Sequence, residues 1–281
     1  SQQQLKRIVR ESYQNLRRTF VELLRFPHES AAYFDTYCHL SQEGRDRIAA
    51  ALQRGNGVIF LTAHLDNWEL AGIFSAHIGF PLKVLVTEQR HSTANDLLNQ
   101  YREVNGNVVI GKGMPLRELM VALKKNELVA IVGDQAGHKR DEYLRFFGRL
   151  AATPAGAFRI AQKNDSDILP CMMERFREQQ HRVHILEPIT FDANAQQERA
   201  ISDVMKTYFA QLEAHINRNP GQWMWGHKRW KYCRTKHITI ISDGRAGHVN
   251  QSKAIARMIE QAVREQCAAD EMIEVNVSTI E

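Results

Sequence analysis

A histidine and a glutamate stand five positions apart in the segment Thr62-Ala-His-Leu-Asp-Asn-Trp-Glu69. An imidazole titrates near neutrality, so it can remove the proton of an alcohol whose oxygen attacks a carbonyl carbon. A carboxylate at the other ring nitrogen would fix the tautomer and stabilise the imidazolium, as in a serine protease, with the substrate's hydroxyl in place of serine. This chemistry predicts His64 as a general base and Glu69 as the carboxylate that orients it.

The same segment also fits a purely structural role. Asp66 is followed three residues later by Glu69, which matches a capping box with an aspartate cap at the start of a helix near Trp68. His64 would then be an ordinary polar residue at the end of a strand. The spacing leaves both interpretations open.

The elements that position these residues alternate regularly along the chain. Strands are predicted at 58–63, 82–86, 108–110, 128–132, 168–173 and 183–186, and helices at 41–54, 68–78, 92–104, 115–125, 154–163 and 200–217. Strands that are apolar on both faces are typical of a parallel sheet covered by helices on both sides. The predicted fold class is therefore α/β, with a largely parallel central sheet.

Two more polar residues follow a neighbouring strand signal. Asp134 and Gln135 come just after the apolar run 128–132. In open α/β sheets, ligands bind at the carboxyl ends of the strands. We expect both residues on the same rim as His64, where they orient an acceptor or support His64; a structural turn is the alternative.

The first 25 residues predict an amphipathic helix. An apolar stripe recurs at helical steps, and the other face is rich in arginine; the stripe consists of Val9, Tyr13, Leu16, Phe20, Leu23 and Leu24. This helix either packs with a solvated basic face or lies on a membrane surface. The chain contains no run of 18 apolar residues. Because it opens with Ser1 in place of Met, we expect that a preceding segment was trimmed, and that segment could include a membrane anchor.

A second unit is predicted after Lys231. A strand at 237–242, a helix at 251–265 and a strand at 272–277 form one βαβ-like unit that is too small to bury a core alone. Gly244 and Gly247 permit a tight turn whose backbone N–H groups could meet a phosphate. We predict an acyl-chemistry domain at 1–232 and the beginning of a Rossmann-like domain at 233–281.

Composition excludes few classes of function. The net charge of +5 suits anionic lipid headgroups, acidic carrier proteins or nucleic acid, and it does not choose among them. The four cysteines are scattered without metal-ligand spacing, so no metal site is predicted. A Gly-x-Ser-x-Gly elbow is missing, which argues against a serine esterase. A repeated basic–aromatic platform for nucleic acid is missing too.

Six motifs in order resemble those of the bacterial lipid A lauroyl/myristoyl acyltransferases, a branch of the lysophospholipid acyltransferase superfamily. The wider superfamily usually has Asp where this chain has Glu69. The six are the HX4E pair His64 and Glu69, Thr87-Glu-Gln-Arg90, Gly133-Asp-Gln135, Phe146-Phe-Gly148, Ala152-Thr-Pro-Ala-Gly156 and the segment Asn219-Pro-Gly-Gln-Trp-Met-Trp-Gly-His-Lys-Arg-Trp-Lys231.

The resemblance implies an enzyme that moves a fatty acyl group from a thioester onto a hydroxyl of a membrane glycolipid such as a lipid A precursor. The donor would be acyl carrier protein or coenzyme A acting as a substrate, and no cofactor is implied. Arg90 would bind a phosphate of the acceptor or carrier, a surface arginine being the alternative. Arg229 would help neutralise a phosphate. The location implied is the cytoplasmic face of the bacterial inner membrane.

The segment Ile241-Ser-Asp-Gly-Arg-Ala-Gly-His-Val-Asn-Gln-Ser252 resembles the opening of the mitochondrial fission ELM-like family, whose fold is similar to that of nucleotide-sugar glycosyltransferases. Ordinary lipid A acyltransferases end near the position of Lys231, so this extension puts the identity of the acceptor in doubt. Two other classes of function stay open: a hydrolase that passes the acyl group to water, and a non-enzymatic basic module that binds lipid or nucleic acid.

Overall fold

The computed structural model describes residues 1–86, 92–111, 115–192, 194, 196–232, 236–241, 243–265 and 275–280. The chain forms two compact units. The first comprises residues 1–135 and 154–228, and the second comprises residues 136–153 and 229–281.

The first unit is built on a seven-stranded sheet in the order β1-β9-β8-β2-β5-β3-β4. Neighbouring strands are parallel except β8 and β9, which are antiparallel. Only five residues connect β8 to β9, and so short a link cannot make a parallel crossover. The largely parallel sheet predicted from the sequence is confirmed. Its strands are β1 (Cys38–Leu40), β2 (Val58–Thr62), β3 (Leu82–Leu85), β4 (Val108–Ile110), β5 (Leu128–Val132), β8 (Asp167–Arg175) and β9 (His181–Ile185).

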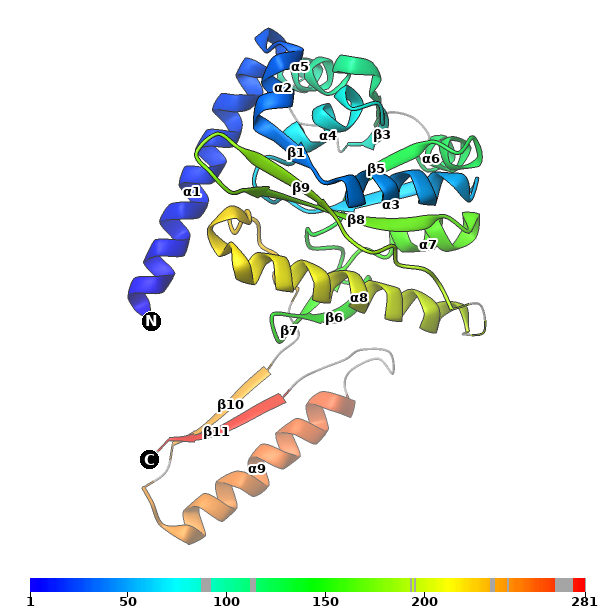
Figure 1. Ribbon diagram of the computed structural model, residues 1–281. Helices are drawn as coiled ribbons and strands as arrows, with labels where there is room; N and C mark the ends of the chain where they lie inside the picture. The colour runs from blue at the N-terminus through cyan, green and yellow to red at the C-terminus, as the bar shows by residue number, and fades with distance from the viewer. Residues whose placement is uncertain are drawn as a thin grey trace. The chain divides into compact units, whose positions relative to one another are not determined.

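Helices cover both faces of this sheet, as Figure 1 shows. On one face, α4 packs against α2, α5 and β3, and on the other, α7 and α8 pack against each other and against β8. Every residue of β2 is buried, as expected for a central strand covered on both sides. The helices are α1 (Gln2–Arg25), α2 (Ala31–Tyr37), α3 (Gln42–Gln53), α4 (Trp68–His77), α5 (Ser92–Arg102), α6 (Pro115–Lys124), α7 (Gly156–Asn164) and α8 (Gln197–Arg218), with short 3₁₀ helices η1 (Phe26–His28), η2 (Val104–Gly106) and η3 (Pro220–Gln222).

The second unit contains a hairpin and a βαβ element. Strands β10 (Lys236–Ile241) and β11 (Val275–Ile280) are parallel, with α9 (Ala246–Glu265) between them in sequence, so the predicted strand–helix–strand order is confirmed. The predicted domain boundary at 232 and 233, and the Rossmann-like assignment of the second part, stay predictions.

The hairpin was not among the strands predicted from the sequence. It consists of β6 (Glu142–Phe146) and β7 (Arg149–Thr153), which pair antiparallel. Phe147 and Gly148 both have positive φ, 50° and 72°, the conformation of a two-residue hairpin turn. Basic residues on the exposed face interrupt the apolar pattern and hide these strands in the sequence.

The described helices include none that is long and apolar enough to cross a membrane.

Candidate active site

Strand register brings His64 and Asp134 together. Thr62 at the end of β2 pairs with Val132 at the end of β5, so each of the two polar residues lies two positions beyond the same rung. The backbone N–H of Gly133 donates to the carbonyl of Thr62 at 2.9 Å, and the backbone N–H of His64 donates to Asp134 Oδ2 at 3.1 Å. The rim predicted from the sequence is therefore a continuous hydrogen-bonded structure.

The imidazole of His64 is held by the carboxylate of Asp134. His64 Nδ1 lies 2.7 Å from Asp134 Oδ1, and Trp223 Nε1 donates to Asp134 Oδ2 at 2.7 Å. Burial raises the pKa of this fully enclosed carboxyl, but the hydrogen bonds from His64 and Trp223 outweigh it and hold the pKa below its usual value. An ionised carboxylate at Nδ1 favours the tautomer in which Nε2 carries the free lone pair.

The other ring nitrogen of His64 faces a more open environment. Its Nε2 lies 3.3 Å from the amide nitrogen of Gln135, which is exposed, and the His64 side chain is 15% exposed. Trp68 packs edge-on against the imidazole with ring centroids 4.9 Å apart. His64 therefore has one nitrogen fixed by a buried acid and one nitrogen that a substrate hydroxyl can reach.

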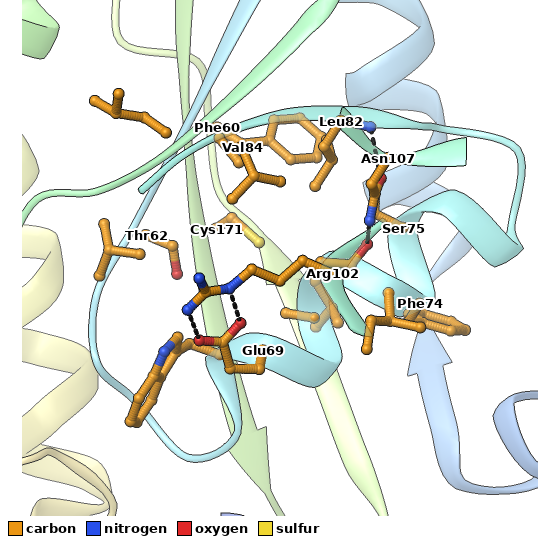
Figure 2. Close-up of a pocket in the computed structure, with 18 of the residues that line it drawn as sticks. Phe60, Thr62, Glu69, Phe74, Ser75, Leu82, Val84, Arg102, Asn107 and Cys171 are labelled. Carbon is orange, nitrogen blue, oxygen red and sulfur yellow. Dashed lines mark hydrogen bonds and ion pairs between the residues drawn. The ribbon is translucent and has the colours of Figure 1, made fainter. Parts of the chain in front are cut away.

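Glu69 occupies a different position from the one predicted. Its two carboxylate oxygens accept hydrogen bonds from Arg102 Nη2 at 2.6 Å and Arg102 Nε at 2.8 Å (Figure 2). The hydrogen bond expected between His64 and Glu69 is not formed, because Glu69 already belongs to the first turn of α4 and its side chain meets α5. Asp134 provides the carboxylate at His64 instead. Burial lowers the pKa of Arg102, but its hydrogen bonds to Glu69 and the opposite charge outweigh this effect. The net shift is upward, so this arginine stays charged.

His64, Glu69 and Arg102 line one largely apolar cavity of about 240 Å³, and Asp134 is buried behind His64. The cavity lies between α4 and the sheet, and Figure 2 shows the side chain of Arg102 extended across it toward Glu69. The partly exposed end holds His64 and Gln135, whereas the apolar part is formed by buried side chains. These apolar side chains include Ile48, Phe60, Ile73, Phe74, Leu82, Cys171 and Ile185.

Comparison with known protein families shows the family of the chain. Residues 1–232 match the family described as bacterial lipid A biosynthesis acyltransferase. The chain belongs to this family. It is 26% identical over 195 residues to a lipid A biosynthesis palmitoleoyltransferase of Escherichia coli (strain K12), covering 67% of this chain and 60% of the relative. It is also 24% identical over 131 residues to a phosphatidylinositol mannoside acyltransferase of Mycobacterium tuberculosis (strain CDC 1551 / Oshkosh), covering 45% of this chain and 42% of that relative.

In this lipid A acyltransferase family member, the alternative of a capping box at Asp66 is wrong. The cap of α4 is Asn67, whose side chain accepts a hydrogen bond from the backbone N–H of Leu70 at 3.0 Å. Asp66 has a positive φ of 44° and is fully buried. Its carboxylate meets His181 Nδ1 at 2.5 Å and Arg175 Nη2 at 3.0 Å.

Asp66 thereby joins the active-site segment to a buried cluster of charges. Glu22 of α1 completes this cluster, since Arg175 donates to its carboxylate at 2.6 and 2.9 Å. Burial raises the pKa of Glu22, but hydrogen bonds from His181 and Arg175 lower it to about 2. Burial lowers the pKa of His181, yet Asp66 and Glu22 raise it above its usual value. The cluster is charged and internally paired, and it fixes the turn that carries His64.

The two remaining residues predicted for substrate binding lie elsewhere. Arg90 is outside the described residues, so its predicted phosphate contact stays a prediction. Arg229 is buried, and its guanidinium donates to Ala152 O and to Thr153 Oγ1, both at 2.6 Å. The structure gives Arg229 a contact that holds the end of β7, and its predicted phosphate contact also stays a prediction.

Sequence reasoning missed Arg102 and the second donor to Asp134, Trp223. Arg102 is the last residue of α5, and a cation in the last turn of a helix is a common dipole partner that carries no functional signal by itself. Trp223 was noted only as part of the motif at 219–231; it is buried.

Proposed function

We propose that this protein transfers a fatty acyl group from an acyl thioester to a hydroxyl of a membrane glycolipid, with a lipid A precursor as the model acceptor. The observation that carries the proposal is the His64–Asp134 pair at the partly exposed end of an apolar cavity. The family of the chain supports acyl transfer, and the printed names of its relatives include acceptors of two glycolipid types.

The proposed reaction begins with an acceptor hydroxyl at His64 Nε2. The imidazole takes the hydroxyl proton while the oxygen forms a bond to the thioester carbonyl carbon, and Asp134 stabilises the imidazolium through Nδ1–H. The tetrahedral adduct then collapses as the carbon–sulfur bond breaks. The thiolate leaves with the proton from His64, so the products are an ester and the free thiol of the carrier. No redox step and no cofactor are required.

The cavity supports this assignment because its two ends suit the two chemical parts of an acyl donor. An alkyl chain transferred from water to apolar side chains gains about 0.8 kcal/mol per buried CH₂ group. The Arg102–Glu69 ion pair also lines the cavity and would attract a polar or charged part of a substrate. Acyl carrier protein and coenzyme A are both compatible donors, and Arg90 is the proposed phosphate anchor.

The proposed place of action is the cytoplasmic face of the bacterial inner membrane, where a glycolipid acceptor and a soluble thioester donor meet. The main competing function is hydrolysis, in which water replaces the acceptor at His64. The two reactions use the same base, so only product analysis separates them.

The test is His64→Ala, assayed by transfer of a labelled acyl chain from acyl carrier protein to a glycolipid. General base catalysis contributes roughly 10²–10⁴-fold, so we expect a loss of about that size with an unchanged melting temperature. His77→Ala is the matched control. His77 Nε2 also lies 2.8 Å from an aspartate, Asp35, and its side chain is 17% exposed, but His77 does not line the cavity. Full transfer by His64→Ala would reject the proposal, and free fatty acid as the sole product would favour the hydrolase.

A further inference from the structure

Helix α1 packs against the protein with its polar side. Ser12 donates to the carbonyl of Trp223 at 2.8 Å, and Thr19 donates to the carbonyl of Asp66 at 3.0 Å. Asn15 is buried on the same side, and Glu22 enters the buried charge cluster. A helix that packs on a protein usually buries its apolar stripe, so this arrangement is reversed along most of α1.

The apolar side chains of α1 are correspondingly exposed. Leu5 is 62% exposed, Val9 44%, Tyr13 67%, Phe20 57% and Leu24 61%. At about 100° per residue these five lie within one arc of roughly 100° of the helix surface. We call this set the apolar stripe of α1. The sequence predicted an apolar stripe that also held Leu16 and Leu23, which are half-buried and buried, and it did not predict that the other members face solvent.

Basic residues border the apolar stripe on one side. At about 100° per residue Lys6, Arg17 and Arg10 lie at or next to one edge of it, Arg18 lies further round, and all four are exposed. Within the described part of the chain none of the four makes an ion pair with an acidic side chain. An exposed apolar surface edged by unpaired cations matches the boundary between acyl chains and anionic headgroups. A protein partner would require acidic groups at the same spacing, whereas anionic lipids rearrange to meet the cations.

We propose that α1 lies along the surface of a bilayer that contains anionic lipids, with its apolar stripe among the acyl chains and its basic side at the headgroups. This inference rests on the proposed function in one respect, since it specifies how the enzyme reaches a membrane acceptor. The inner side of α1 contacts Asp66, two residues from His64, and Trp223, the donor to Asp134. Membrane binding through α1 therefore brings the reactive histidine to the surface where a glycolipid headgroup lies.

The test is flotation of the full 281-residue chain with vesicles of phosphatidylcholine, alone or mixed with an equal part of phosphatidylglycerol. We expect binding to the mixed vesicles, and a loss of about tenfold or more for Tyr13→Gln/Phe20→Gln because two large apolar groups leave the bilayer. Arg10→Gln/Arg17→Gln should lose a similar factor on mixed vesicles only, at about fivefold per basic residue.

Leu116→Gln/Val121→Gln is the matched control, because these residues of α6 are 57% and 44% exposed and lie outside α1. Equal loss in the control, or wild-type binding by Tyr13→Gln/Phe20→Gln, would overturn the proposal. The proposal would also be overturned if the wild-type protein did not bind vesicles and formed a dimer that Tyr13→Gln/Phe20→Gln converts to a monomer. The His64→Ala protein should float like wild type, and Tyr13→Gln/Phe20→Gln should keep transfer to a detergent-dispersed acceptor, so failure of this inference is distinguishable from failure of the proposed function.

Discussion

Two histidine–aspartate pairs lie on opposite sides of one short turn. His64 is bound by Asp134 at 2.7 Å, and Asp66, only two residues after His64, is bound by His181 at 2.5 Å. In the first pair His64 lines the apolar cavity, and its Nε2 lies beside the exposed side chain of Gln135. In the second pair both side chains are fully buried, and Arg175 and Glu22 complete the set of charges. The comparison teaches that only the first pair meets the needs of the proposed reaction, because a general base must present a ring nitrogen to a substrate cavity.

The largest expected effect is on the accessible pair. In Asp134→Asn the imidazole loses its ionised partner, and by analogy with serine proteases the transfer rate should fall by roughly 10³–10⁴-fold. Turnover with a labelled acyl thioester measures this loss, and circular dichroism checks the fold. Asp35→Asn is the control, since it alters the exposed pair with His77. Activity of a folded Asp134→Asn protein within tenfold of wild type would contradict the role assigned to Asp134.

For the fully buried pair, His181 and Asp66, the main effect of a substitution should be on the free energy of unfolding. Asp66→Asn leaves Arg175 and His181 with one carboxylate in place of two, and removing one partner from a buried charged set costs about 3–5 kcal/mol of unfolding free energy. Urea denaturation measures the loss. The folded fraction should keep a transfer rate within a few-fold of wild type, since the backbone contacts of the turn remain. A folded, stable Asp66→Asn protein without activity would place Asp66 in the catalytic machinery and remove the contrast.

The loss of unfolding free energy at acidic pH should depend on Glu22. Its pKa is depressed from 4.5 to about 2, so it stabilises the fold above pH 4.5 and this contribution is lost as the pH falls toward 2. The shift corresponds to about 3 kcal/mol at most, as an order of magnitude. Unfolding free energies across this range should show a shallower slope for Glu22→Gln. Glu198→Gln, at an exposed pair with Arg159, should leave the slope nearly unchanged.

The smallest effect concerns Glu69, which the sequence assigned to His64 and the structure assigns to Arg102. Glu69→Gln should reduce transfer by about 10–100-fold, because a charged pair at the cavity is weakened while the His64–Asp134 bond persists. A double-mutant cycle with Arg102→Gln separates the two assignments. If Glu69 acts through Arg102, the double variant loses little more than either single one. If a second cycle instead shows coupling between Glu69→Gln and Asp134→Asn, Glu69 acts at His64 as the sequence predicted.

Much of the fold was predictable because the signals are local. The strands predicted at 58–63 and 128–132 are apolar except for Thr62, and the helix predicted at 41–54 begins after its serine cap, Ser41. The strand at Cys38–Leu40 was not predicted, since three residues show no periodicity. The hairpin β6–β7 was missed for the opposite reason: its exposed charged residues conceal the alternation.

For the candidate site, the sequence by itself pointed to His64 as a candidate base, to the acidic residues near it and to the rim on which they lie. A base after one apolar strand and Asp134 after another follow from local composition and from the rule for parallel sheets. Only the tertiary structure decided which acid binds which base. The pairing of β2 with β5 places Asp134 beside His64. The packing of α5 against α4 places Arg102 beside Glu69, where the two form an ion pair. The physical reason is that a hydrogen bond depends on a few tenths of an ångström between segments far apart in the chain, and no spacing along the sequence encodes that distance.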